Sequence, residues 1–236
     1  MPGQHRTRSY LIAALLACSG CGNAASDEGM TDKTGQKASP AGDGAAQAGA
    51  SAFGEAVLAY PDDLQMTMLA YRLTGRRPPL EDWAGDDFDV RRADEFSKPQ
   101  LLQDETARLA AIHDATEDAG FLQYRLRSQL SQYDSAKGGY YLTAFAPGQQ
   151  TTYSGREQVS VQLENMSEAF FWPMDAQQAQ DMLALTNRNV TIDVKVRITG
   201  TSRRSSGIVI TGRITDYGLY SEGYNDERLL ARFSLE

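Results

Sequence analysis

Apolar and polar residues alternate along most of the second half of the chain, the pattern of strands that are buried on one face only. The clearest run is residues 190–198, where every second residue is valine or isoleucine. Similar alternation or clustering of apolar residues predicts further strands at residues 122–130, 140–145, 158–164, 208–214 and 229–235. The pattern therefore predicts about six strands.

The preceding segment has helical rather than strand periodicity. One helix is predicted from Pro61–Asp63 up to Gly75, a glycine suited to a helix C-terminus. A second is predicted from Ser97, with Pro99 in its first turn, to about Thr116. A short helix capped by Asp175 interrupts the strands. We expect an α+β fold, with the N-terminal helices packed on one face of a roughly six-stranded, mainly antiparallel sheet and one short inserted helix.

The composition divides the chain into three parts. Residues 22 to about 54 are almost all small or polar, and such a segment buries too little apolar surface to offset its ordering entropy. We expect a signal peptide at 1–17, a lipidated cysteine and flexible linker at 18–54, and a single α+β globular domain at 55–236.

The first 21 residues have the features of an export signal. Arg6 and Arg8 precede a short apolar run at residues 10–17, which ends at Cys18, with Cys21 close behind. The run is far shorter than the roughly 20 residues that span a bilayer. This segment resembles the lipobox of bacterial lipoproteins, with Cys18 favoured as the acylated residue and Cys21 the alternative.

The lipobox resemblance implies cleavage before the cysteine, a diacylglyceryl group on its thiol and usually a further acyl group on its amine. Two or more acyl chains anchor a protein stably to a membrane. The next residue is Ser19 or Gly22, and neither is the aspartate associated with inner-membrane retention. The resemblance therefore implies a cell-envelope lipoprotein, on the outer membrane.

The sequence lacks the residues that several kinds of catalytic and metal site usually contain. Both cysteines lie in the signal region, and His113 is the only histidine after it. We therefore expect no metal site, no catalytic residues and no cofactor. The net charge of −8 disfavours nucleic-acid binding. The acids at 81–89 do not fit the calcium spacing of an EF-hand, and we interpret them as a solvated acidic loop.

Basic residues gather on the polar sides of the predicted strands despite the acidic composition. Arg125 and Arg127 share one side of their strand, as do Lys195 and Arg197, because residues two apart point the same way. We predict that these four form an anion-binding surface, since guanidinium groups bind phosphate and carboxylate through two oxygens at once. The anion would belong to an envelope lipid, polymer or protein.

Residues 60–236 also resemble uncharacterised domains of proteobacterial envelope lipoproteins, in the helix that begins at Ser97-Lys98-Pro99 and in the closing strand-loop-strand. No activity follows from that resemblance. The sequence favours a membrane-anchored, non-enzymatic accessory or binding module. The alternative is a periplasmic hydrolase that uses carboxylates.

Overall fold

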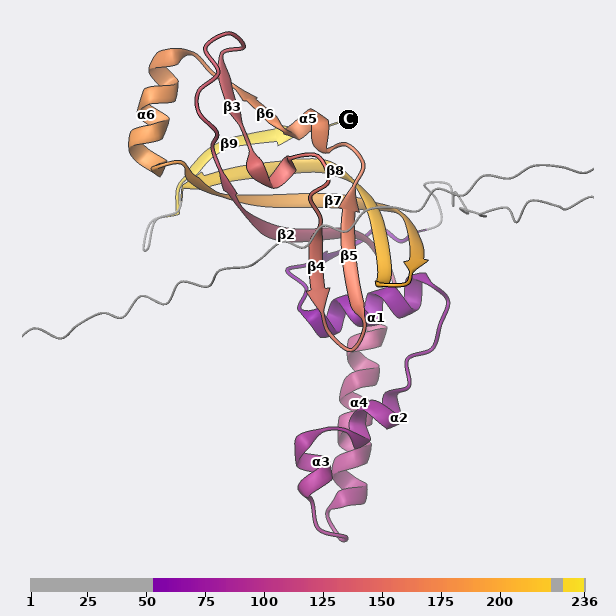
Figure 1. Cartoon of the computed structure of the whole chain (residues 1–236). Coiled ribbons are helices and arrows are strands. Elements are labelled where there is room, and N and C mark those ends of the chain that lie inside the picture. Colours follow the sequence, from indigo (N-terminus) through magenta and orange to yellow (C-terminus); the bar gives the residue numbers. More distant parts are fainter. Residues whose placement is uncertain (1–52, 222–226, 236) are drawn as a thin grey trace, which may run out of the picture. The chain divides into compact units, whose positions relative to one another are not determined.

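The computed structural model describes residues 53–221 and 227–235, which all belong to one compact unit (Figure 1). The predictions for the signal peptide, Cys18, Cys21 and most of the linker concern residues outside this part. Among the described residues, the chain forms a mixed α/β structure around a seven-stranded sheet, with a separate two-stranded sheet beside it.

The main sheet has the strand order β1-β2-β7-β8-β5-β4, with β9 also paired to β8. Its long central strand, β8, pairs with β7 along almost its whole length, while β5 and β9 share its other edge. The strands of this sheet are β1 (Ala56–Ala59), β2 (Ala119–Gln129), β4 (Thr151–Ser154), β5 (Gln158–Leu163), β7 (Asn189–Arg204), β8 (Gly207–Ser221) and β9 (Leu229–Ser234). The small sheet pairs β3 (Gly139–Tyr141) with β6 (Phe171–Pro173).

The predicted α+β class, with a mainly antiparallel sheet of about six strands, is wrong. The sheet is mixed, because β1 runs parallel to β2 and β5 runs parallel to β8. Alternation of apolar and polar residues reports that one face of a strand is buried, and it does not report the direction of the neighbouring strand. The short strands β1 and β4 also carry little alternation that could have been found in the sequence.

Helices occupy the N-terminal part of this unit and the connections between the later strands. They are α1 (Asp63–Leu73), α2 (Leu80–Gly85), α3 (Phe88–Arg92), α4 (Lys98–Asp114), α5 (Met166–Ala169), α6 (Ala176–Thr186) and the 3₁₀ helix η1 (Thr143–Phe145). A capping box begins α1, in which the Asp62 carboxylate accepts from the Gln65 backbone N–H. The Asp175 side chain accepts from the Gln178 N–H at the start of α6. No helix in the described residues is long and apolar enough to cross a membrane.

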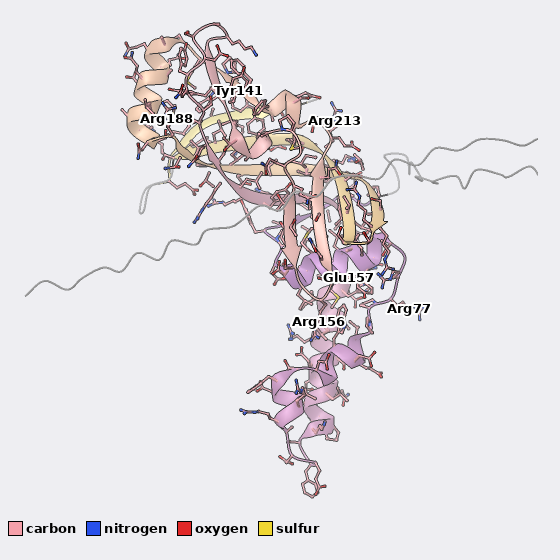
Figure 2. All side chains as sticks on the ribbon, in the orientation of Figure 1. Arg77, Tyr141, Arg156, Glu157, Arg188 and Arg213 are labelled. Carbon is pink, nitrogen blue, oxygen red and sulfur yellow. The ribbon has the colours of Figure 1, made fainter. Side chains whose placement is uncertain are left out.

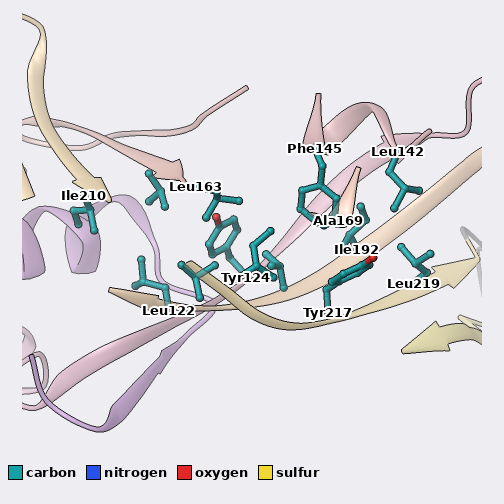
Figure 3. Close-up of a cluster of buried hydrophobic side chains, with 14 of the residues drawn as sticks. Leu122, Tyr124, Leu142, Phe145, Leu163, Ala169, Ile192, Ile210, Tyr217 and Leu219 are labelled. Carbon is teal, nitrogen blue, oxygen red and sulfur yellow. The ribbon is translucent and has the colours of Figure 1, made fainter. Parts of the chain in front are cut away.

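The buried apolar residues form two clusters rather than one. The larger fills the concave side of the main sheet, where residues of β2, β7 and β8 meet η1 and α5 (Figure 3). Met66, Leu69 and Ala70 of α1 belong to this cluster. The smaller joins α1, α2 and α4, with Leu109 as the buried residue of α4. The predicted packing of all N-terminal helices on the sheet is therefore wrong, because α4 buries its apolar residues mainly against other helices.

Two local predictions also need correction. Residues 140–145 are not one strand of the main sheet: β3 ends at Tyr141 and the next residues form η1. The acidic segment at 81–89 is not a loop, because α2 and α3 run through it. Both errors arise from segments of only three to six residues, which are too short to show a period.

Polar contacts attach the helices to the turn between β4 and β5 (Figure 2). Glu157 in that turn accepts from Arg76 at 3.1 Å and from Arg203 at 3.4 Å. Its neighbour Arg156 donates to the backbone oxygen of Trp83 at 3.2 Å and contacts Asp86 at 3.3 Å. These contacts fix the start of the helical segment against one end of the main sheet.

Candidate anion-binding face of the main sheet

The four basic residues predicted from the sequence lie on two neighbouring strands. Because β2 pairs with β7, the side chains of Arg125, Arg127, Lys195 and Arg197 all project from the face of the sheet opposite the large core. We call this the outer face. Arg125 lies opposite Asp193, and Arg127 lies opposite Thr191. The outer face therefore carries all four positions and places a carboxylate among them.

Arg125 and Arg197 are held by carboxylates. The Arg125 guanidinium lies 3.0 Å from Glu227 and 3.9 Å from Asp193. Arg197 donates to both oxygens of Glu55, at 3.1 and 3.4 Å. The Glu55 side chain is 78% exposed, so this pair adds little stability in water.

Asp193 is the carboxylate that organises this region. Its side chain is 12% exposed and accepts from the Tyr60 hydroxyl at 2.5 Å and from the Gln123 amide at 2.9 Å. The hydrogen bond to Asp193 raises the pKa of Tyr60, so the phenol stays protonated and keeps donating. Tyr60 adopts a left-handed backbone (φ 50°) where the chain turns from β1 towards α1. Such a conformation costs about 1–3 kcal/mol for a non-glycine residue, and the contacts with Asp193 and Gln123 help to hold it.

Lys195 and Arg232 have a different environment. Lys195 lies between Gln123 and Asp216 in the pairing of β2, β7 and β8, and its ammonium is 4.9 Å from the ring centre of Phe121. Arg232 on β9 lies opposite Gly218 of β8. Within residues 53–221 and 227–235, neither cation makes an ion pair.

A hollow lies between these two cations, and Gly218 is part of its lining. Gly218 stands between Asp193 on β7 and Arg232 on β9, and the Tyr220 ring lies over it. A Cβ added there would come within 3.0 Å of the Tyr220 ring. The hollow has a volume of about 80 Å³ and is lined by Gln123, Asp193, Lys195, Asp216, Gly218, Tyr220 and Arg232. This space has room for one small group of the size of a phosphate or carboxylate, and both cations and acids line it.

Arg127 lies away from this hollow. It borders a different one, of about 120 Å³, together with Leu126 of β2, Thr151 of β4 and apolar residues of β5. Arg213, which is paired with Glu168 at 3.3 Å, is on the outer face farther along β8 (Figure 2). The predicted set is thus distributed over the outer face, and only Lys195 contributes to the hollow.

The four residues predicted from the sequence do not include Arg232, Asp193 or Gly218, although Arg232 is one of the basic residues on the polar sides of the predicted strands and Asp193 is an acid beside them. Arg232 has a basic side chain on the polar side of its strand, but only the β8–β9 register shows that it faces Gly218. The sequence does not mark Gly218 as a site residue, because glycine in a strand is compatible with a bulge, a bend or an open space. Within the described residues, no group of three or more His, Cys, Asp or Glu side chains could hold a metal ion.

Comparisons with family models, curated proteins and solved structures found no match to this chain.

Proposed function

We propose that this chain is a membrane-anchored envelope lipoprotein whose domain is a non-enzymatic binding module for an anionic envelope component. The lipobox-like segment with Cys18, or Cys21 as the alternative, supports the anchor, and the same resemblance supports the outer membrane. The hollow at Gly218 supports the binding function. A phosphate or carboxylate group of the ligand would enter it between Lys195 and Arg232.

The contrast among the cations carries this proposal. Arg125 and Arg197 already have carboxylate partners, whereas Lys195 and Arg232 border an open space without an ion pair in the described part of the chain. Charge-assisted hydrogen bonds to an anion are about twice as strong as neutral ones, which gives both side chains a reason to bind one. Asp193 and Asp216 keep the hollow from being purely cationic, and they favour ligands that also present hydroxyl or amine donors.

The alternative, a carboxylate-dependent hydrolase, has one observation in its favour: Asp193 and Asp216 line the same hollow. Two facts count against it. Asp193 already accepts from Tyr60 and Gln123, and Asp216 accepts from the Thr215 hydroxyl at 3.0 Å. The hollow is also small, at about 80 Å³, whereas a glycosidase must seat a sugar ring between its carboxylates.

The binding function is tested with soluble probes, because a lipidated chain inserts into any vesicle. The full chain in zwitterionic detergent micelles is titrated calorimetrically with glycerol 3-phosphate and, separately, with oligogalacturonate. The Lys195→Gln/Arg232→Gln double variant should weaken binding by more than about tenfold, since two charge-assisted hydrogen bonds are lost. The control Arg77→Gln/Arg91→Gln removes the same charge from exposed sites elsewhere. Equal weakening in both variants, or binding of neither probe by the native chain, contradicts the proposal.

The anchor is tested separately by intact-mass measurement of the protein purified from its own membranes. We expect a chain that begins at Cys18, or at Cys21, and carries the mass of at least two acyl groups. An unmodified chain that begins at Met1 contradicts the anchor and leaves the binding function open.

A further inference from the structure

The helical arm, which we define as residues 80–114 with α2, α3 and α4, exposes large apolar side chains. Phe96 is 86% exposed, Phe88 is 63% exposed and Leu101 is 37% exposed. All three lie in the 14 residues that include α3 and the first turn of α4. Single exposed apolar residues are common, and three large ones within one short stretch make this stretch a candidate interaction surface.

The backbone that carries Phe96 is well ordered by hydrogen bonds. One Asp94 carboxylate oxygen accepts from the backbone N–H of Phe96 at 2.8 Å and of Ser97 at 3.1 Å. The Ser97 hydroxyl donates to the other oxygen at 2.7 Å. This hydroxyl, followed by the two backbone donors, lowers the pKa of Asp94. Because the turn is already fixed, Phe96 can be buried by a partner without a large ordering cost.

Phe88 is positioned in a similar way. It is the first residue of α3, and the preceding Asp87 caps this helix by accepting from the Asp89 N–H at 2.9 Å. The Arg92 guanidinium lies 4.4 Å from the centre of the Phe88 ring. The ring therefore has a defined place on the arm and remains largely open to solvent.

The surroundings of these rings are strongly acidic. Residues 81–105 contain nine acidic and three basic side chains. Some of the acids have partners, such as Glu105, which binds Arg108 at 2.6 Å. Glu81, Asp82, Asp89 and Glu95 are exposed, and in the described part of the chain their carboxylates make no hydrogen bond or ion pair.

From these observations we infer that the helical arm is a docking site for a basic protein surface with an apolar pocket that receives Phe96. The exposed rings supply the buried contact, and the unpaired carboxylates select the charge of the partner. An anionic lipid surface is a poor occupant, because the acidic arm would be repelled by it. A second copy of the same arm is repelled for the same reason. This inference does not depend on the proposed function of the sheet face.

The test places the photo-crosslinking amino acid p-benzoylphenylalanine at position 96 of the full chain in the organism that makes it. The same residue at Leu185, an exposed leucine of α6, is the matched control. We expect a 96-specific adduct with one identifiable protein, in which the cross-linked peptide comes from a lysine- and arginine-rich surface. An adduct with lipid, with a second copy of this chain, or none above the control overturns the inference.

Charge reversal then tests the selection of the partner. Asp89→Lys/Glu95→Lys should reduce the yield of this adduct at least severalfold, whereas Glu117→Lys/Glu164→Lys, the same change at exposed sites elsewhere, should leave it near the native level. A yield that is insensitive to both changes overturns the basic-partner assignment. All of these residues are exposed. An unchanged thermal unfolding midpoint for each variant shows that the fold is intact.

Discussion

The outer face of the sheet and the helical arm use charge in opposite ways. On the outer face, cations and acids alternate, so that Arg125 and Arg197 find carboxylates within the domain. On the arm, acids outnumber bases by nine to three between residues 81 and 105, and several carboxylates have no partner in the described residues. The net charge of −8 therefore describes neither surface. What each region can bind follows from which charges are already paired.

The largest effects should come from breaking the core under each region. Ile192→Ala and Leu109→Ala each remove a buried side chain and should cost about 2–5 kcal/mol in the free energy of unfolding. The two residues lie in different apolar clusters. Hydrogen exchange should then show that Leu109→Ala lowers the protection of amides in the arm, while β7 stays protected. Ile192→Ala should lower protection throughout. Equal loss in both regions from Leu109→Ala means that the arm is not a separate cooperative unit.

The junction between α1 and α4 should be sensitive to pH through His113. Arg72 lies 3.1 Å from the imidazole Nδ1 and donates to the His113 backbone oxygen at 2.9 Å. The imidazole Nε2 is buried and has no hydrogen-bond partner in the described residues. Burial and then the Arg72 charge lower the pKa of His113, and the weaker influence of Asp114 opposes them.

A lowered histidine pKa means that protons bind more tightly to the unfolded chain. The stabilising contribution is therefore complete above the unfolded value of about 6.5 and is lost as pH falls through the folded value. We expect the free energy of unfolding to decrease between pH 7 and pH 5. His113→Asn keeps an acceptor near the Nδ1 position and should flatten this slope. Urea unfolding of both proteins across this pH range measures the difference between their slopes. The carboxylate titrations are common to both proteins and cancel in this difference. Parallel slopes contradict this role for His113.

The smallest effects should come from the ion pairs of the outer face. Arg125→Gln and Arg197→Gln each remove a partly exposed pair, and each should change the free energy of unfolding by less than about 1 kcal/mol. Neither should weaken anion binding as strongly as the loss of Lys195. Arg91→Gln on the arm is a control for the charge change. A large loss of binding in Arg125→Gln with native binding in Lys195→Gln would move the site away from the hollow.

The longer elements of this domain could be predicted from the sequence, and their arrangement could not. The residues of α1, α4, β2, β7 and the start of α6 carry clear periodicity or a capping residue. The parallel position of β1 beside β2 depends on where a 59-residue connection returns the chain, and alternation within a strand does not record that. The parallel β1–β2 pair was missed for this reason, and the direction of β5 beside β8 is likewise not recorded by alternation within a strand.

The candidate site shows the same limit. Side chains two residues apart in a strand point the same way. The sequence could therefore predict that Arg125 and Arg127 share one side of their strand, and that Lys195 and Arg197 share one side of theirs. Which cations have acid partners depends on register, and on residues as distant as Glu55 and Glu227. The position of Arg232 beside the hollow requires the β8–β9 pairing as well. Acylation at Cys18, or at Cys21 as the alternative, remains a prediction from the sequence.

The central claim is that an anion binds in the hollow above Gly218 and not to the outer face in general. Gly218→Val tests this most directly, because its side chain has to displace the Tyr220 ring that lines the hollow, while the chain keeps every charged residue. The variant is titrated calorimetrically with glycerol 3-phosphate and with oligogalacturonate. The affinity for the probe that the native chain prefers should fall by more than about tenfold. The salt dependence of any residual binding should be unchanged. Native affinity in Gly218→Val would contradict the claim.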